Sequence, residues 1–182
     1  SFLGTSPISS LPYVMIGEIR DEETANIAVT ASITGHLVVS TLHTNSSSAS
    51  ITRLVDMGLD SYLIADSVVG VIAQRLARRL CSCKVPHEAT EEEKRIIRVP
   101  QDQNITIYGP GGCNQCNFTG YRGRIGVYEM MTVTRKIKNI IAAKGNTEDI
   151  EKVAIEEGMS TLHSSAARLV REGVTSRIPV RH

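Results

Sequence analysis

The sequence predicts an α/β protein that begins with a parallel sheet, continues into a small cysteine-bearing subdomain and ends in helices. An apolar run, a helical segment and a second apolar run follow one another within residues 13–43, an order typical of a parallel α/β layer. The four cysteines form two tight pairs. After residue 128, apolar residues recur at helical spacing, which predicts C-terminal helices.

Composition narrows the class of protein. The chain has 182 residues, of which 41% are hydrophobic, and a net charge of +1, so it can bury a core and is not disordered. The near-neutral charge and few aromatics argue against a nucleic-acid-binding module. No apolar run approaches the roughly 18 residues that cross a bilayer, and the N-terminus lacks a signal-peptide pattern. We expect a cytoplasmic protein that binds no nucleic acid.

The first third of the chain alternates strands and helices. Residues 1–12 are turn-like. Residues 13–16 and 36–43 are continuous apolar runs, which predict strands buried on both faces of a parallel sheet. Between them, Asp21 is the expected N-cap of a helix that reaches Ile33.

Two further helices are expected before the cysteines. The serines of residues 46–48 can cap a helix that Gly58 ends. Asp60 can begin a second helix that continues to Leu80, because apolar residues recur at helical spacing. In such a helix three arginines would lie on one side, namely Arg75, Arg78 and Arg79.

The pattern changes at Cys81. A capping box at residues 90–93 begins a short helix that reaches about Ile97, and residues 105–108 predict a strand. After that come three amphipathic helices, the last ending before Gly173. We therefore expect a core portion in residues 1–80, a cysteine subdomain in residues 81–128 and a helical region in residues 129–182.

Glu18 is the first candidate for chemistry. It lies one glycine beyond a predicted strand, and ligands of open α/β sheets bind at the carboxyl ends of strands. A carboxylate there can hold a Mg²⁺-bound water or orient water for attack on a γ-phosphate. The alternative is that Glu18 is a solvated loop residue. Acidic residues are favoured at the start of a helix, which explains Asp21 and the two glutamates after it, but Glu18 lies before the N-cap and is not explained in this way.

His36 and His43 stand at the two ends of the second predicted strand. Seven residues of extended chain span about 20–23 Å, so the two imidazoles cannot touch the same phosphate. His43 is at the carboxyl end and is the better candidate to contact a nucleotide. The alternative is that both are surface histidines bonded to neighbouring groups.

Several ordered motifs closely resemble those of the secretion ATPase superfamily. GEIRDEETA (residues 17–25) resembles its Walker B region, and TGHLVVSTLHTN (residues 34–45) its histidine box. AQRLARRLC (residues 73–81) resembles the segment that leads into its tetracysteine subdomain. With the cysteine pairs and GYRGRIGVYE (residues 120–129), the likeness narrows to the extension-type ATPases of type II secretion and type IV pilus assembly.

The resemblance implies the latter part of a RecA-like P-loop NTPase core. In it, Glu18 corresponds to the Walker B glutamate, tied to Mg²⁺ and the attacking water, and His36 and His43 to the histidine-box pair. It also implies a segment that packs near ATP and neighbouring subunits, comprising Gln74, Arg75, Arg78 and Arg79; the alternative for the arginines is a solvated basic face. A homohexamer is implied, docked on the cytoplasmic face of the inner membrane, where ATP hydrolysis drives a membrane platform protein.

No phosphate-binding loop of the form GxxxxGK[ST] occurs in the sequence. In the family that loop lies upstream, and family members are longer than this chain. We therefore expect a C-terminal piece that does not hydrolyse ATP alone and whose exposed half-core favours non-native oligomers. One rival hypothesis is a non-catalytic, zinc-stabilised interaction module. A second is nucleic-acid binding through the arginines and Lys84, against which the low net charge weighs.

The cysteine pairs differ in spacing. Cys113 and Cys116 have the two-residue gap of a zinc knuckle, whereas Cys81 and Cys83 have one intervening residue, where the family normally has two. Three interpretations stay open. All four thiolates bind a structural Zn²⁺, His87 replaces Cys81 as a ligand, or the loops hold reduced thiols or a disulfide without metal.

Overall fold

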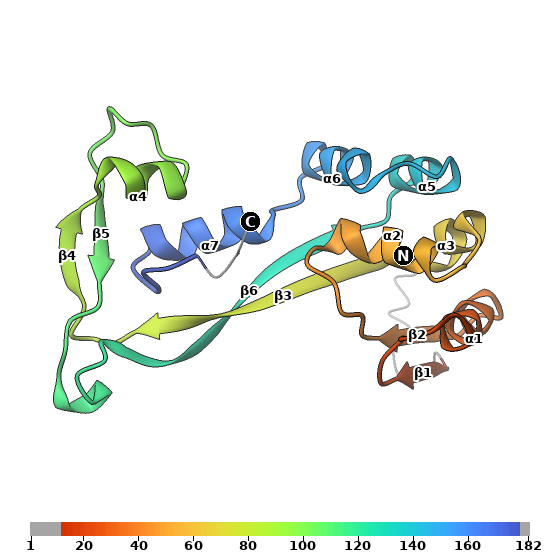
Figure 1. Ribbon diagram of the computed structural model, residues 1–182, viewed down its shortest axis with the longest axis horizontal. Coiled ribbons are helices and arrows are strands. Elements are labelled where there is room, and N and C mark those ends of the chain that lie inside the picture. Colours follow the sequence, from red (N-terminus) through yellow and green to blue (C-terminus); the bar gives the residue numbers. More distant parts are fainter. Residues whose placement is uncertain (1–11, 179–182) are drawn as a thin grey trace, which may run out of the picture. The chain divides into compact units, whose positions relative to one another are not determined.

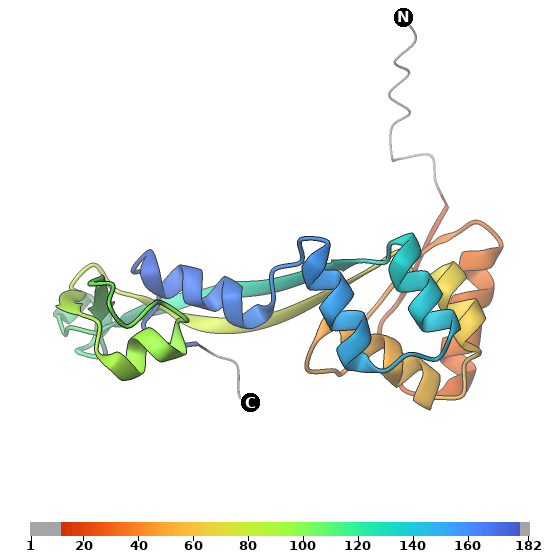
Figure 2. The ribbon, with the colours of Figure 1, turned by 90° about the horizontal axis from the view of Figure 1, so that it is seen from above.

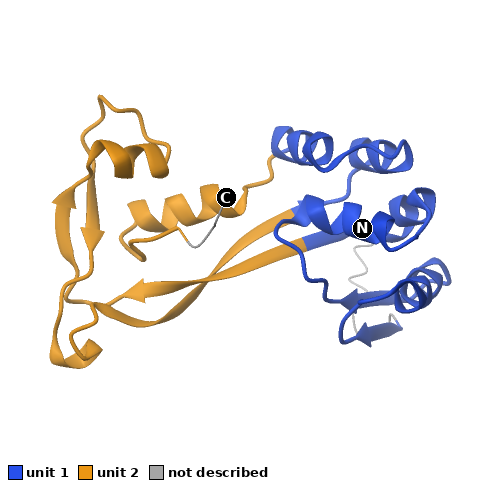
Figure 3. Cartoon of the chain, in the orientation of Figure 1, with its two compact units in different colours: residues 1–71, 131–157 blue, residues 72–130, 158–182 orange. Residues whose placement is uncertain are grey.

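The computed structural model describes residues 12–178 of the chain, so all but the last residue of the turn-like segment expected in residues 1–12 lies outside them. The chain is α/β and forms two compact units (Figure 3). Unit 1 contains residues 1–71 and 131–157, and unit 2 contains residues 72–130 and 158–182. The three functional regions expected from the motifs stay a prediction.

Unit 1 contains a small parallel sheet and five helices (Figure 1). Its elements are β1 (Tyr13–Ile16), α1 (Glu22–Ile33), β2 (Leu37–Ser40), α2 (Ser47–Asp56), α3 (Ser61–Ser67), α5 (Arg135–Ala142) and α6 (Thr147–Glu156). β1 and β2 pair in parallel, with Tyr13 opposite Leu37 and Met15 opposite Val39. The predicted strand–helix–strand order is confirmed, because α1 is the crossover between them.

The helix limits of unit 1 follow the capping residues. The Asp21 side chain accepts a hydrogen bond from the Thr24 N–H at 2.8 Å, and α1 ends just before Gly35. Ser46 caps α2 in the same way, and Gly58 follows it with a φ of 99°. These helices confirm the predictions made from the caps, because each side-chain oxygen satisfies an N–H group that the first turn leaves unpaired.

The prediction that both early strands are buried on two faces is wrong. Tyr13 and Met15 are each 78% exposed, and their partners Leu37 and Val39 are 45% and 48% exposed. Within residues 12–178, β1 and β2 form a sheet of two strands that no third strand joins. Apolar runs are typical of strands that other elements cover on both faces. In the described residues, however, one face of β1 and β2 is an exposed apolar patch.

Unit 2 is built on a ribbon of two long strands, β3 (Gly70–Leu80) and β6 (Tyr121–Thr132), whose last residues at one end belong to unit 1. The ribbon is antiparallel, since the Val133 N–H donates to the Val69 carbonyl and the Cys81 N–H to the Gly120 carbonyl. The remaining elements are β4 (Val85–Glu88), α4 (Glu91–Ile96), β5 (Thr106–Gly109), the short 3₁₀ turn η2 (Asn114–Cys116) and α7 (Leu162–Arg171).

The helix predicted from Asp60 to Leu80 is also wrong. Helix α3 ends at Ser67, and residues 70–80 form strand β3. Exposure alternates from Gly70 to Ala77, as it does in a strand with one covered face. Three arginines therefore do not share a helix face. The apolar spacing of four residues fits a period of 2 as well as it fits a helix, and pairing with β6 decides between them.

Helix α7 lies along the ribbon and joins the two small cores of unit 2 (Figures 1 and 2). Its Ala166 and Leu169 pack with Ala77 and Val127 of the ribbon. The adjacent residues Ala167 and Val170 of α7 belong to a second cluster, which includes residues of β5 and of the end of α4. The helix thereby fixes the β4–β5 hairpin, and the loops attached to it, against the ribbon. No helix in residues 12–178 is long and apolar enough to span a membrane.

The buried carboxylate of Glu129 anchors the start of α7. Glu129 is 3% exposed, and its Oε2 accepts the Leu162 N–H at 3.0 Å. We expect Glu129→Ala to lower the free energy of unfolding by about 2 kcal/mol, because an N–H group at the helix start loses its acceptor. Urea unfolding would measure it. The exposed Glu156→Ala should stay within about 0.5 kcal/mol of the parent, and an equal loss in both variants would contradict the anchoring role.

Candidate active site and metal centre

The loop that carries Glu18 is fastened at the carboxyl ends of β1 and β2. The Thr41 hydroxyl donates to the Gly17 carbonyl at 2.7 Å, and the Ile19 N–H donates to the Thr41 carbonyl at 3.0 Å. Ile19 itself is buried, with 8% of its surface exposed. Glu18 is thus held from both sides at the sheet edge where ligands bind in open α/β sheets.

Glu18 contacts two cationic or ionisable side chains. Its Oε2 lies 2.6 Å from the Arg20 guanidinium, and its Oε1 lies 2.8 Å from Nε2 of His43. The Arg20 hydrogen bond is the main cause that lowers the pKa of Glu18; burial opposes it, and the charges of Arg20 and His43 add to it. The carboxylate is therefore ionised at neutral pH. It is suited to accept hydrogen bonds from water or from a hydrated cation.

The two candidate histidines lie in different surroundings. His43 reaches Glu18, while His36 precedes β2 and places its Nδ1 3.4 Å from the Thr34 hydroxyl. The structure therefore brings Glu18 and His43 together. Their closeness arises from the parallel pairing of β1 and β2, which places both strand ends at one edge.

The four residues proposed to pack near the nucleotide lie on β3, in unit 2. Gln74 is exposed and Arg75 is half-buried, as alternation along a strand requires. The Arg78 guanidinium lies 4.1 Å from the centroid of the Tyr121 ring, a cation–π contact. Arg79 is exposed beside the cysteine loop.

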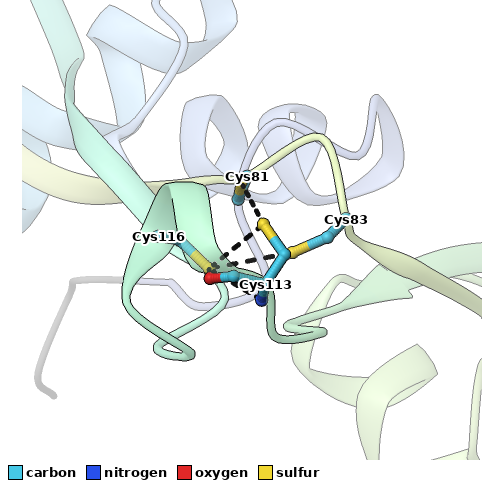
Figure 4. Close-up of side chains that lie close together, drawn as sticks. All are labelled: Cys81, Cys83, Cys113 and Cys116. Carbon is cyan, nitrogen blue, oxygen red and sulfur yellow. Dashed lines mark hydrogen bonds between the residues drawn. The ribbon is translucent and has the colours of Figure 1, made fainter.

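All four cysteines meet in one cluster (Figure 4). Their sulfurs lie within 4.8 Å of one another, and three of the pairs are 3.8 Å apart: Cys81–Cys113, Cys83–Cys116 and Cys113–Cys116. All four are free thiols. A tetrahedral Zn²⁺ with bonds of about 2.3 Å separates its sulfur ligands by about 3.8 Å, so the donor set fits zinc in both chemistry and size.

The two halves of the cluster are built differently. Cys113 precedes η2 and Cys116 is its last residue, and the chain continues into Asn117 and Phe118 with φ of 49° and 59°. Cys81 follows β3 directly, and its N–H donates to the Gly120 carbonyl at 2.9 Å. Ribbon pairing, rather than a second knuckle, therefore brings the Cys-x-Cys pair to the other half.

Backbone N–H groups point at one sulfur in particular. Burial opposes ionisation of Cys116, but hydrogen bonds from the Cys113 and Gly120 N–H groups outweigh it and lower the pKa of this thiol to about 6. Burial is the main cause that raises the pKa of Cys83 to about 12. Hydrogen bonds, the first of them from the Cys83 backbone, also lower the pKa of Cys81, so the cluster contains thiols that ionise more readily than a free cysteine and suit a metal cation.

His87 lies outside the cluster. Its Nε2 is 3.0 Å from the Glu93 carboxylate, and the same glutamate completes the capping box of α4. The ligand atoms gathered in the structure are therefore the four sulfurs.

Two residues of the candidate site, Arg20 and Thr41, were not predicted from the sequence. Arg20, the strongest partner of Glu18, lies two residues away in the same loop, and this short spacing was an available signal. Thr41 lies two residues before His43, and nothing in the sequence marks it as the residue that holds the Glu18 loop. Its role needs the pairing of two strands to become apparent.

The contacts of Glu18 predict an ordered response of its pKa. Arg20→Gln should raise the carboxyl pKa toward its ordinary value, because the strongest stabilising hydrogen bond is weakened. His43→Gln should raise it less, since its charge is the smallest cause. An NMR titration of the Glu18 side-chain carboxyl measures both shifts, and His36→Gln is the matched control, which should leave the pKa unchanged. A larger shift for His43→Gln than for Arg20→Gln would contradict this order.

Comparison with solved structures places the fold. The chain is similar to the ATPase DotB of Legionella pneumophila, with a TM-score of 0.62 and 18% identity, over 94% of this chain and 38% of that one. It is also similar to the pilus retraction motor PilT with bound ADP, with a TM-score of 0.58 and 24% identity, over 89% of this chain and 36% of that one.

Sequence comparisons place the family. The chain is 44% identical over 164 residues to the type II secretion system ATPase E of Vibrio cholerae, covering 90% of the chain and 32% of the relative. It is 43% identical over 180 residues to the type IV pilus assembly ATPase PilB of Myxococcus xanthus, covering 97% of the chain and 31% of the relative. The chain thus spans about a third of their length. The sequence profile described as "Type II/IV secretion system protein" matches residues 12–181, and the chain belongs to this family.

Proposed function

We propose that this chain supplies the Walker B and histidine-box part of an ATPase that powers type II secretion or type IV pilus assembly. In this proposal unit 1 contains the latter part of a RecA-like core. The single observation that carries it is the ionised carboxylate of Glu18, held at the carboxyl end of a parallel strand by Arg20 and His43. The names of the relatives, which are ATPases of these two systems, support it.

The chemistry assigned to Glu18 is orientation rather than strong base catalysis. Its lowered pKa makes it a weak proton acceptor but a good hydrogen-bond acceptor for an attacking water. Bound ATP and Mg²⁺ would supply the γ-phosphoryl group and neutralise its charge. His43 is positioned to hold the carboxylate in place, and being 87% exposed it can turn toward a ligand. His36, Gln74, Arg75, Arg78 and Arg79 are proposed to serve the nucleotide side and neighbouring subunits.

The assembly proposed for the longer protein is a homohexamer. It would act on the cytoplasmic face of the inner membrane, where subunit movement driven by ATP turns a platform protein of the secretion or pilus machinery. The phosphate-binding loop needed for hydrolysis does not occur in these 182 residues, so activity belongs to the longer polypeptide.

The cysteine cluster is proposed to hold one structural Zn²⁺. Cys81, Cys83, Cys113 and Cys116 would be its four ligands, and four protein ligands leave no position for a substrate. Zinc there would fasten the loop after β3 to the loop before β6. Its contribution is thus to the folding of unit 2.

The ATPase proposal is tested with Glu18→Gln in the full-length polypeptide. We expect ATP hydrolysis to fall about a hundred-fold while ATP binding persists, because the amide cannot orient water as the carboxylate does. The nearby exposed Glu22→Gln is the control and should keep its activity. The 182-residue chain alone should show no Mg²⁺-dependent turnover. Unchanged hydrolysis by Glu18→Gln would sink the proposal.

The zinc proposal is tested by metal analysis of protein purified without chelators. We expect about one zinc per chain, lost in Cys83→Ser and in Cys116→Ser, since either change removes a tetrahedral ligand. His87→Gln should retain its zinc, because His87 is paired with Glu93. Zinc below a few tenths of an equivalent in the parent chain would refute the site. Loss of zinc in His87→Gln would point to a Cys₃His site.

A further inference from the structure

A cavity of about 490 Å³ lies beside the cysteine cluster and is built entirely from residues of unit 2. Its walls come from the end of β3, the loop after it, the start of β6 and the segment that follows α7. This volume falls in the range of small-molecule sites. Two of its lining residues also belong to the proposals above, Arg79 to the nucleotide side and Cys81 to the zinc site, and the others have no role in either.

The cavity is lined by three cationic side chains, those of Arg79, Lys84 and Arg122. The two arginines are exposed, and neither guanidinium group forms a hydrogen bond or ion pair with any residue in the described part of the chain. Ser82 and Gln115 add neutral donors to the same wall. Three positive charges around one space attract an anion.

Lys84 is already held in place. Its Nζ donates to the Gly173 carbonyl at 2.6 Å and lies 4.2 Å from the centroid of the Tyr108 ring. A Cβ added to Gly173 would lie 2.8 Å from this Nζ and would collide with Tyr108, and the residue has a φ of +66°. The glycine therefore leaves the room that the ammonium group occupies.

One carboxylate lines the cavity, and it already has a cationic partner. The Glu172 carboxylate forms an ion pair with Arg168 at 2.9 Å. The guanidinium donors of Arg79 and Arg122 stay available.

We propose that this cavity binds a phosphate group of the diphosphate or phosphomonoester class. Two guanidinium forks and a fixed ammonium match a multiply charged phosphate better than a single carboxylate, because three cations face one space. The proposal needs residues of this chain only, so it does not depend on ATP hydrolysis by the longer protein.

Pyrophosphate is the probe for this site, titrated into the 182-residue chain at low salt with detection by amide NMR and calorimetry. We expect one saturable site, with shifts at the residues that line the cavity. The double variant Arg79→Gln/Arg122→Gln should weaken binding about ten-fold or more. Arg124→Gln is the matched control, because Arg124 is an exposed arginine of the same strand that does not line the cavity.

Three outcomes would overturn the proposal. They are no saturable binding at millimolar pyrophosphate, equal weakening in Arg124→Gln and in the double variant, and loss of zinc from the double variant without any pyrophosphate binding. The last would mean that the cations only balance the charge of a metal tetrathiolate. Vesicles of phosphatidylcholine and phosphatidic acid distinguish the source of the phosphate. Binding to them that pyrophosphate displaces supports the site with a lipid headgroup as ligand, whereas tight binding to them that pyrophosphate does not displace counts against it.

Discussion

The pairing of β3 with β6 is the constraint on which the architecture of unit 2 depends. Residues 81 and 120 are brought together by the hydrogen bond between the Cys81 N–H and the Gly120 carbonyl, so the segment between them becomes a closed loop. Closing a loop of this length costs conformational entropy, which local turns alone do not offset. The ribbon provides the first closure, and the four sulfurs gather at the same place. A metal bound there would stabilise what the backbone has already brought together.

The same ribbon presents its covered face to α7. Ala77 and Val127 pack against Ala166 and Leu169, while the buried Glu129 accepts the first N–H of the helix. Small residues at Ala166 and Ala167 allow the helix to contact the ribbon on one side and the β4–β5 cluster on the other. The position of the cysteine loops is therefore determined by long-range packing. A single turn would not determine it.

Local chemistry made much of the fold predictable, and long-range pairing decided the rest. Asp21 and Ser46 marked helix starts because a capping oxygen acts within three residues. The helix prediction failed at β3 because its apolar residues 72, 76 and 80 have a spacing of four, which both helix and strand satisfy. Its partner β6 lies far along the sequence, so no local signal identified the pairing. The exposed face of β1 and β2 was not predicted for a similar reason. An apolar run indicates that a strand can be buried on both faces, but it does not identify the element that would cover each face.

The candidate site divides along the same line. Glu18 was predictable because it follows an apolar run by one glycine, and its closeness to His43 follows once two parallel strands are paired. Arg20 was not identified, since a charged residue beside another in a loop is common on any surface. Convergence of the four sulfurs was one of three open interpretations, because a single residue separates Cys81 from Cys83. The pairing of β3 with β6 brings this pair to the other two sulfurs.

The double attachment of Thr41 has a mechanical consequence. Its hydroxyl holds the carbonyl before Glu18, and its own carbonyl holds the N–H after it, so the carboxylate is clamped to the neighbouring strand. A slide of β2 along its axis must drag the acidic side chain with it. The two hydrogen bonds thereby couple the position of the Glu18 carboxylate to the position of the second strand.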